Sequence, residues 1–405
     1  MSSEYDIAKS FQRIEETLIE SMKRNLTRHL REEQELGMNW SSWQSEQLKA
    51  LEEFKKNNKK LFKNDFSNIN SSIEELLKKS YQDGNLSQEK TILEAIKSGD
   101  FNSNNKEINK LWNIFKRTKN QRIKNKQMKK IYETVNHAEA EFFKINERKL
   151  KALINETVEN FKKAEMSILR YTEDKYRKII FDAQVYANTG AGTTQQAIDM
   201  ASKDFLSKGI NNIEYSNGRL VNIVSYAEMA IRTANLRAFL QGEGAKRDEW
   251  GVHTVLVPNR GVGCPYCIKF QGKVFIDDVW SRGKSEESKQ TGYPLLSTAI
   301  KEKLFHPNCK DTLVTFFDGV STTPSVPTKA QLEEKTTRYK LEQTQRYNER
   351  QIRKYKRLEL GSTDNEDIEK YHKKRIEWQQ FNKEFCEKNN LKRRYEREKI
   401  IVSTQ

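Results

Sequence analysis

The 405-residue sequence has few residues that break helices or form cross-links, with 6 Pro, 17 Gly and 4 Cys. Its hydrophobic fraction is only 35%, and it has no run of about eighteen apolar residues, the length that a membrane-spanning helix needs. The first residues, Met1 to Asp6, lack the charged and then apolar order of a signal peptide. We therefore expect a soluble protein, made in the cytoplasm, without a membrane partner.

The four cysteines are too few and too unevenly placed for a disulfide framework. Three of them lie within residues 264–309, and Cys386 stands apart in a charged segment with helical periodicity. Such usage fits a reducing compartment better than an oxidising one. We interpret Cys386 as a partly buried free thiol, which packs as a small apolar side chain.

Charge is plentiful, with 73 Lys and Arg against 57 Asp and Glu, a net charge of +16. A mean hydropathy of -0.90 predicts long helices that bury only a stripe. The basic excess favours acidic partners, nucleic acid before membrane surfaces, although acidic residues alternate with the basic ones along most helices. In the basic cluster Lys116 to Lys130, which lacks interleaved aromatics, a solvated helix face is favoured over nucleic-acid contact.

Apolar residues recur at spacings of three and four over much of the chain, the pattern of amphipathic helices. We expect one such helix at about 6–36, and short helices at 73–81 and 88–96 separated by Asp83-Gly84-Asn85. Residues 108–182 contain no Gly or Pro, which predicts one or two very long helices, partly coiled-coil in character. The first helix would bury Ile7, Phe11, Ile14, Leu18 and Met22.

The composition changes at Asn188 to Gly192, where we place a domain boundary. Residues 213–215 and 220–223 flank Ser216-Asn217-Gly218, and Asn-Gly between two such runs predicts a β-hairpin. A helix is expected at about 226–240. Three further strands are expected over residues 252–257, 273–276 and 312–317.

The end of the chain is a linker followed by two basic helices. Ser321 to Pro327 has a linker composition, and helices are expected over 330–360 and from about residue 364 onwards. The fold class is therefore α+β and mostly α. Three consecutive domains are predicted: a long-helix region over 1–187, a compact module over 188–320, and a linker with a basic helical tail over 321–405.

The basic tail is a candidate surface for DNA or for an acidic protein. Its cations outnumber its acids, yet the acids are interspersed, so both partners stay open. The candidate contact residues are Arg346, Arg350, Arg353, Lys354 and Arg357.

The pattern richest in chemistry is Cys264-Pro265-Tyr266-Cys267 followed by His306-Pro307-Asn308-Cys309. Two half-sites with two residues between their ligands would present three thiolates and one imidazole, the donor set of a tetrahedral zinc site. Four protein ligands leave no open position, so we predict a structural zinc site that staples the short strands together.

Two alternatives to zinc stay open for these cysteines. Cys-x-x-Cys alone suits thiol exchange, although no thioredoxin-like βαβ pattern surrounds it and a second half-site lies downstream. A reduced thiol cluster without metal is the other alternative.

Catalysis has weaker support in the sequence. The candidate residues for an enzyme of the nuclease or ADP-ribosyltransferase type are Arg232, Thr233, Glu249 and His253. They form no paired-carboxylate, Ser-His or Cys-His arrangement, and no glycine loop suited to phosphate accompanies them. We therefore expect no enzyme activity and no small-molecule substrate. A third class, a zinc-stabilised nucleic-acid-binding protein, lacks a basic helix of finger length between Cys267 and His306.

Several motifs in order resemble the phage minor capsid protein 2 family. The resemblance covers about residues 187–400, including the tail Gln345 to Lys354. One departure is Lys310-Asp311 where members similar to this chain have Arg-His after the last cysteine. The motifs are Gly218-Arg219, Tyr226, Met229, Ile231-Arg232-Thr233, Glu249-Trp250-Gly251, Cys264 to Cys267, Phe270 to Val274 and His306 to Cys309.

This resemblance implies a structural component of a tailed-phage head, made in the host cytoplasm and located in the virion. A protein of this family is expected in few copies, incorporated near the portal during head assembly. Its implied partners are the portal and major capsid proteins, with packaged DNA as a further contact.

Overall fold

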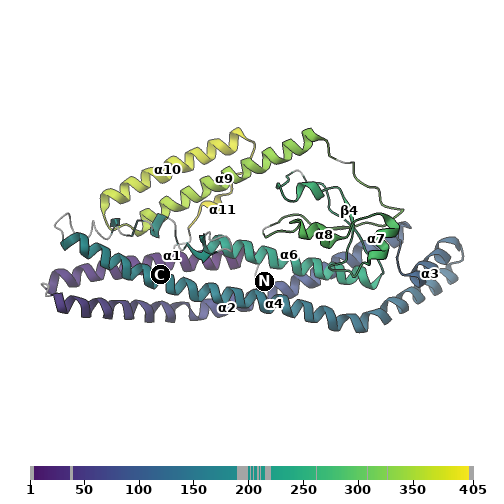
Figure 1. Ribbon diagram of the computed structural model, residues 1–405, viewed down its shortest axis with the longest axis horizontal. Coiled ribbons are helices and arrows are strands. Elements are labelled where there is room, and N and C mark those ends of the chain that lie inside the picture. Colours follow the sequence, from purple (N-terminus) through teal and green to yellow (C-terminus); the bar gives the residue numbers. More distant parts are fainter. Residues whose placement is uncertain are drawn as a thin grey trace. The chain divides into compact units, whose positions relative to one another are not determined.

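The computed structural model describes residues 4–36, 40–188, 199–200, 202–203, 205–207, 209, 211–214, 220–260, 262–307, 309–325 and 327–400. Its long helices are α1 (Glu4–Leu36), α2 (Trp40–Ser98), α4 (Gln121–Asn188), α6 (Ile223–Glu249), α9 (Lys329–Gly361) and α10 (Asn365–Lys388), drawn in Figure 1. The shorter helical segments are α3 (Lys106–Arg117), η1 (Ile268–Phe270), α7 (Ser285–Thr291), α8 (Leu296–Lys301) and α11 (Tyr395–Glu398). The strands are β1 (Asn211–Glu214), β2 (Leu220–Asn222), β3 (Thr254–Leu256), β4 (Val274–Ile276) and β5 (Val314–Thr315). The predicted α+β, mostly α class is confirmed.

Contacts between residues divide the chain into two compact units, each built from distant segments. Unit 1 comprises residues 73–157 and 229–339, and unit 2 comprises the described residues of 2–72, 158–228 and 340–405. The changes from one unit to the other fall within α2, α4, α6 and α9. The units do not follow the consecutive ranges 1–187, 188–320 and 321–405, which stay a prediction about the chain's organisation. The first predicted boundary, at 188–192, falls almost wholly outside the described residues.

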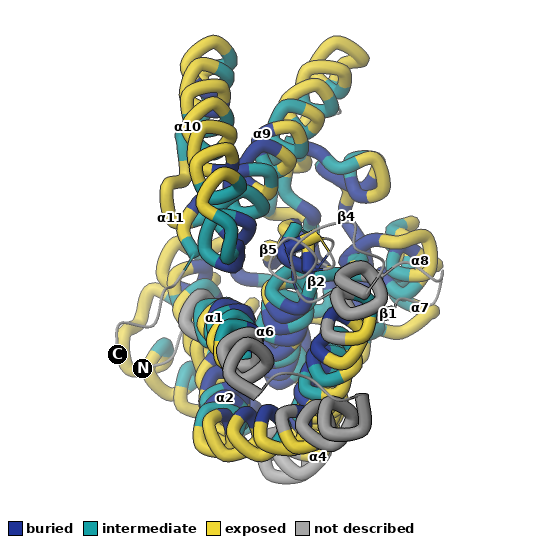
Figure 2. Tube along the Cα trace, turned by 90° about the vertical axis from the view of Figure 1, so that its left-hand side faces the viewer, coloured by how far each residue is buried: buried dark blue, intermediate teal, exposed yellow. Residues whose placement is uncertain are grey.

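In unit 2, α1 packs its apolar stripe against the neighbouring parts of α2 and α4. The ring of Phe11 lies 5.4 Å from that of Phe161, and Phe54 stacks on Tyr176 with 4.4 Å between ring centroids. In Figure 2 the buried faces of these helices turn inward and the exposed faces turn outward. The predicted stripe is confirmed, since all five of its members are fully buried: Ile7, Phe11, Ile14, Leu18 and Met22.

The basic tail contributes most of α9, together with α10 and α11, to unit 2. Asp364 begins α10, because its side chain accepts hydrogen bonds from the amides of Glu366 and Asp367 at 3.0 and 3.2 Å. At the end of α9, Gly361 packs against Leu206 with no room for a larger side chain. The predicted helices after the linker are confirmed. Strands β1 and β2 pair antiparallel, as the hairpin prediction required, while the turn itself lies outside the described residues.

In unit 1, α2 and α6 cross with their backbones in contact. A Cβ atom on Gly84 would lie 2.2 Å from the carbonyl oxygen of Phe239, and one on Gly242 would lie 2.0 Å from that of Tyr81. The predicted break at Asp83-Gly84-Asn85 is therefore wrong, since α2 continues through it. Gly84 serves the close approach of two helices and does not end one.

Helices α3 and α4 form an antiparallel hairpin whose base is held in the core of unit 1. Ile108 and Trp112 of α3 and Ile131 of α4 belong to one buried cluster with Trp250 and Phe317. Asn105 caps α3 through its side-chain oxygen, which accepts hydrogen bonds from two backbone amides at 3.0 and 3.3 Å. The hairpin is thus fixed to a cluster that also contains Val252 and Phe317, residues next to β3 and β5.

The sheet of unit 1 has the order β4-β3-β5, with both pairs antiparallel. Val255 faces Phe275 on β4 and Thr315 on β5. The three predicted strands are confirmed, though they are short. Within the described residues, no helix is both long and apolar enough to cross a membrane.

Candidate metal centre

The first half of the predicted metal site is a turn between β3 and η1. The amides of Cys267 and Ile268 both donate to the carbonyl oxygen of Cys264, at 3.2 and 3.1 Å. The amide of Cys267 also lies 3.4 Å from the sulfur of Cys264, so the backbone donates toward that sulfur. The chain beyond the turn is fixed to the sheet, because the amide of Gly272 donates to the carbonyl of Val257 at 2.7 Å.

The second half lies between α8 and β5. Lys303 and Phe305 adopt left-handed backbone conformations, with φ of 78° and 54°. Such residues cost on the order of 1 kcal/mol each. The buried side chain of Leu304 between them helps to offset that cost. The amide of Cys309 then donates to the carbonyl of His306 at 2.8 Å, which closes the second turn.

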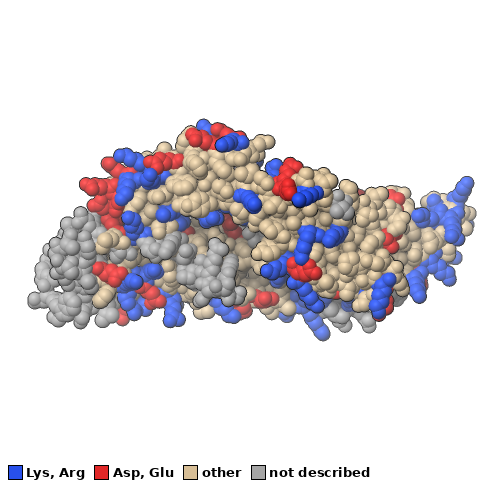
Figure 3. Space-filling view, turned by 45° about the horizontal axis from the view of Figure 1, so that its top comes forward, with Lys and Arg blue, Asp and Glu red and all other residues tan. Residues whose placement is uncertain are grey.

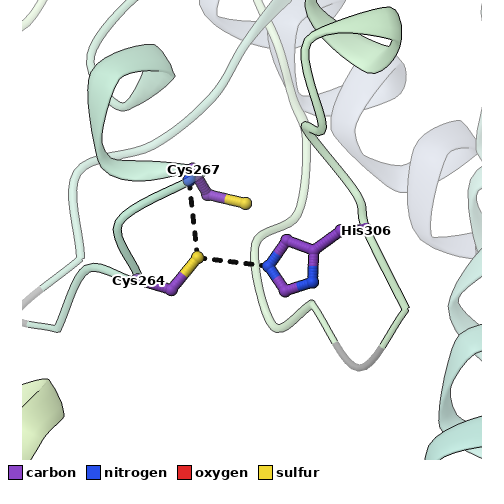
Figure 4. A group of neighbouring side chains, drawn as sticks. All are labelled: Cys264, Cys267 and His306. Atoms are coloured by element: carbon purple, nitrogen blue, oxygen red, sulfur yellow. Dashed lines mark hydrogen bonds between the residues drawn. The ribbon is translucent and has the colours of Figure 1, made fainter. Parts of the chain in front are cut away.

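The two halves meet with their side chains pointing toward one another, as Figure 4 shows for Cys264, Cys267 and His306. The sulfur of Cys264 lies 3.1 Å from Nε2 of His306, and the sulfur of Cys267 lies 3.4 Å from that of Cys309. The ligand atoms of Cys264, Cys267 and His306 all lie within 4.8 Å of one another, as do those of Cys267, Cys309 and Asp311. The structure therefore brings the four predicted ligands together as two overlapping groups that share Cys267, and we call these residues the cluster.

The cluster has a buried side and an open side. Cys267 and Cys309 are part of the hydrophobic core that also contains Phe270 and Leu304. Cys264 and His306 are half-buried, and the ring of His306 contacts that of Tyr266 at 5.6 Å. An ion bound here would be shielded by apolar side chains on one side and reachable from solvent on the other.

The imidazole of His306 is oriented for binding through Nε2. Its Nδ1 lies 2.8 Å from the carbonyl oxygen of Pro307, so Nδ1–H donates to that oxygen. The lone pair of Nε2 then faces the sulfur of Cys264. Metal-binding histidines commonly have such a hydrogen bond on the second nitrogen, because it fixes both tautomer and ring direction.

The acid–base properties of the four side chains favour ligand formation. The pKa of Cys264 is lowered to about 4, chiefly by its hydrogen bond with Cys267 and further by that with His306. Hydrogen bonding with Cys267 lowers the pKa of Cys309 also, and that with Cys264 raises the pKa of His306 to about 9. The pKa of Cys267 is raised because it shares its proton with both neighbouring sulfurs. Cys264 is thus a thiolate at neutral pH before any metal binds.

Asp311 is a member of this cluster that the sequence prediction missed. Its Oδ2 accepts from the thiol of Cys309 at 3.5 Å, and its Oδ1 accepts from the side-chain amide of Gln271 at 3.0 Å. Gln271 in turn accepts from the ammonium of Lys335 at 3.3 Å. The only sign of Asp311 in the sequence was its position two residues after Cys309. There, Lys310-Asp311 was interpreted only as a departure from the family pattern.

The donor set fits a divalent metal ion of the zinc type. Two sulfurs bound tetrahedrally to one zinc ion lie about 3.8 Å apart, and a sulfur and an imidazole nitrogen about 3.6 Å. The distances of 3.4 and 3.1 Å are shorter by only a few tenths of an ångström. With four ligands from the protein, such an ion would have a structural and not a catalytic role. The cluster can therefore hold a metal ion.

Comparison with known families decides the identity of the chain. A model of the family described as phage minor capsid protein 2 matches residues 113–387, which is most of the sequence and includes the whole cluster. The chain belongs to the phage minor capsid protein 2 family. It is therefore a structural protein of a phage head, located in the virion, and the predicted resemblance is confirmed. Comparison with curated proteins and with solved structures gave no match.

Two of the enzyme candidates, Thr233 and Glu249, form contacts within α6. Thr233 donates to the carbonyl of Met229 at 2.7 Å, within the turn of its own helix. Glu249 forms an ion pair with Lys246 at 2.7 Å. These contacts support the α6 helix and its end.

His253 lies between two carboxylates in the same unit. Its Nδ1 is 2.9 Å from Glu287 and its Nε2 is 3.3 Å from Asp248. Burial alone would lower the pKa of His253, but hydrogen bonds with Asp248 and Glu287 raise it to about 9. The ring is thus charged at neutral pH, which does not suit a general base.

The five predicted contact residues of the tail divide into inward and outward members. The guanidinium of Arg357, only 7% exposed, donates to the carbonyls of Leu206 and Ser207 at 3.2 and 3.3 Å. Arg353 donates to the carbonyl of Arg397. Both therefore hold unit 2 together. The outward members are Arg346, Arg350 and Lys354, of which Arg350 is exposed and the other two half-buried.

Proposed function

We propose that this minor capsid protein is incorporated near the portal during head assembly, that it contacts portal and major capsid proteins, and that it has no catalytic role. The family match over residues 113–387 carries this proposal. The long helices support it, because they present extended surfaces to partners, and nothing in the described part of the chain favours an enzyme.

An aromatic patch on α9 and α10 supports a protein partner for the tail. Tyr347 is 47% exposed and Phe381 is 50% exposed, and the ring of Trp378 lies between 5 and 6 Å from each. The guanidinium of Arg350 lies over the ring of Tyr347 at 5.8 Å. Exposed aromatics with Arg are the composition of protein–protein interface centres. We assign Arg346, Arg350 and Lys354 to this contact.

We propose further that Cys264, Cys267, His306 and Cys309 hold a structural Zn²⁺ ion. The ion would cross-link the two turns and so hold β4, α7 and α8 against the core of unit 1. The thiolate character of Cys264, the lowered pKa of Cys309 and the fixed Nε2 of His306 support this assignment. The reduced thiol cluster and the redox pair remain the alternatives to be tested.

The composition of purified phage heads tests the proposal. We expect the polypeptide at a fixed ratio to the portal protein, well below that of the major capsid protein, with one zinc per chain. Its absence from heads, or a copy number equal to that of the major capsid protein, would contradict the assignment. A zinc content below about a tenth of a mole per mole of chain would contradict the metal assignment but not the role in the phage head.

The patch on the tail can be tested in the same heads. Replacing Tyr347 and Phe381 by Ala should lower incorporation, because both rings are exposed and available to a partner. A matched control replaces the exposed Leu61 and Leu86 of α2 by Ala, which removes similar apolar area away from the patch. Equal incorporation of both variants would show that the patch has no partner.

A further inference from the structure

The end of the α3–α4 hairpin carries a concentration of positive charge that no acidic residue interrupts. Residues 116–130 contain six Lys and two Arg and no Asp or Glu, a net charge of +8 and half of the chain's +16. We name these fifteen residues the basic tip. All of its cations except the half-buried Lys124 are exposed. Figure 3 shows Lys and Arg side chains crowded at the right-hand end of the view, where α3 lies in Figure 1.

The hairpin geometry brings these cations to one place. Lys116 and Arg117 end α3, three residues form the turn, and Arg122 stands in the first turn of α4. The side chain of Asn120 caps α4 by accepting from the amides of Arg122 and Ile123 at 3.0 and 3.4 Å. The two helix ends therefore present one continuous basic surface.

The start of α4 is unfavourable for cations. The N-terminus of a helix carries partial positive charge, so acidic side chains stabilise it and basic ones destabilise it. The first turn of α4 has no acidic residue, and the next residues include Lys124 and Lys126. This sequence places repulsive charges where a carboxylate would stabilise the helix, which indicates an external anion.

The cations of the basic tip have no carboxylate partner among the described residues, although the ammonium of Lys124 lies over the ring of Phe115 at 5.3 Å. Within the described part of the chain, none of its eight cations forms an ion pair. On α10 the pattern is different, since Lys374 pairs with Glu377 at 2.7 Å and Arg375 with Glu359 at 2.7 Å. Cations three or four residues apart on one helix, such as Lys126 and Lys130, are about 5 to 6 Å apart at their Cβ atoms, within the Debye length of about 8 Å at physiological salt, and so repel. An anionic partner would relieve that repulsion.

The tip is held in place by the core. Trp112, one turn before the tip, and Ile131, directly after it, are both buried in the cluster around Trp250. The ring of Trp112 also stacks on that of Phe115 at 5.0 Å. The surface is therefore presented by an anchored hairpin and not by a free loop.

We propose that the basic tip binds the phosphate backbone of duplex DNA without reading its sequence. This inference rests on the proposed function, because packaged DNA is the polyanion inside a phage head. Lys is depleted at protein–protein interfaces, and the tip has six Lys and no aromatic residue. Lys and Arg contacts to phosphates supply non-specific DNA affinity through counterion release. The aromatic tail patch and the lysine-rich tip thus suit different partners.

The test measures binding of the purified full-length chain to two labelled duplexes of unrelated sequence over a series of salt concentrations. The proposal expects equal affinity for both duplexes and a slope of log K against log salt of about -5 to -7, from six to eight phosphate contacts. A slope shallower than about -1, or a strong preference for one duplex, would overturn it.

A charge-neutralised variant locates the contact. Replacing Lys116, Arg117, Lys119 and Arg122 by Gln should make the slope shallower by about 3 to 4 and lower the affinity about tenfold or more at low salt. The matched control replaces four exposed lysines of α2 by Gln, namely Lys56, Lys59, Lys60 and Lys63. Equal losses in both variants would show that net charge, and not the basic tip, governs binding. Far-UV circular dichroism and thermal midpoint should match the wild type for both, since all eight side chains are exposed.

Incorporation of the tip variant and of the wild type into phage heads distinguishes a failure of this inference from a failure of the proposed function. The tip variant should enter heads at the wild-type ratio to the portal. If it binds DNA as the wild type does but is lost from heads, the tip contacts protein and the inference is wrong. If the wild-type chain is itself absent from heads, the proposed function fails while the DNA-binding result stands.

Discussion

The sulfur of Cys267 lies 3.4 Å from the sulfur of Cys309, although 42 residues separate them in the sequence. Both side chains are buried in the core around Phe270 and Leu304. The segment between them contains β4, α7 and α8, so a bond between its ends closes a long loop. Closing such a loop removes chain entropy from the unfolded state, and an ion that binds only the folded form adds its binding energy to stability.

The first prediction concerns the metal. Cys264→Ser should abolish zinc binding and destabilise unit 1 by more than about 3 kcal/mol, because binding energy at a structural zinc site is folding energy. The long helices should keep their far-UV signal. Metal content after dialysis and thermal unfolding with and without a chelator measure both effects.

Cys386 provides the matched control for that substitution. It is a buried cysteine, only 2% exposed, that lies in unit 2 outside the cluster. Cys386→Ser should retain full zinc content and lose only about 1 to 2 kcal/mol from burial of a hydroxyl. Unchanged thermal stability of the wild type in the presence of a chelator would count against the metal assignment.

The cluster was largely predictable because two-residue spacings are local. Cys264 and Cys267, and His306 and Cys309, each occupy one turn, so their mutual proximity depends on few torsion angles. The meeting of the two halves follows from the antiparallel sheet, whose strands were also predicted. Asp311 was missed because its role depends on Gln271, a contact that no local pattern shows.

The long helices were predicted less evenly. The stripe from Ile7 to Met22 was predicted correctly because helical periodicity alone selects buried residues. The predicted break at Gly84 was wrong. Without knowledge of the tertiary structure, a glycine between two helical segments predicts a turn. The partner of Gly84 is the backbone of Phe239, about 150 residues away, and local propensity carries no information about it.

The second prediction concerns Gly84→Ala. The two possible roles of Gly84 predict stability changes of opposite sign for this substitution. If Gly84 only weakened α2, then Gly84→Ala would stabilise the protein by about 0.5 to 1 kcal/mol. The contact with the carbonyl of Phe239 instead predicts destabilisation by about 2 to 3 kcal/mol, since neither backbone can yield. Denaturant unfolding measures the sign. Asp83→Ala, at the exposed neighbouring position, is the control and should change stability by less than about 0.5 kcal/mol.

The third prediction concerns His253 and pH. Because Asp248 and Glu287 raise the pKa of His253 from 6.5 to about 9, the folded state holds this proton more tightly than the unfolded state. The resulting stability is fully present below pH 6.5 and is lost as pH rises through about 9. The shift corresponds to about 3 kcal/mol.

His253→Gln should therefore be less stable than the wild type at about pH 6, and the difference should shrink as pH rises to about 10. Chemical unfolding at several pH values measures it. His372→Gln, which changes an exposed histidine paired with Glu359, is the matched control. A difference for His253→Gln that stays constant over this range would contradict the role of the two carboxylates.

The fourth prediction concerns Glu16, a fully buried residue of α1. Neither of its carboxylate oxygens has a hydrogen-bond partner among the described residues. Burial, reinforced by the neighbouring Glu15, raises its pKa from 4.5 to about 8, although Arg357 and Arg353 act in the opposite direction. Between these values the folded protein keeps a proton that the unfolded chain has released, so stability falls as pH rises from 4.5 to about 8.

Glu16→Gln should remove this loss, because the amide stays neutral at every pH. The variant should match the wild type near pH 4 and exceed its stability by about 5 kcal/mol above pH 8. Glu20→Gln, one turn further along α1 at a half-buried position paired with Arg24, is the control and should keep most of the pH dependence, because Glu20 makes the smallest contribution to the raised pKa of Glu16. If the two variants gave the same profile, the burial of Glu16 could not be the cause. If Glu16→Gln were instead less stable at high pH, the carboxylate would have to be charged and held by Arg353 and Arg357.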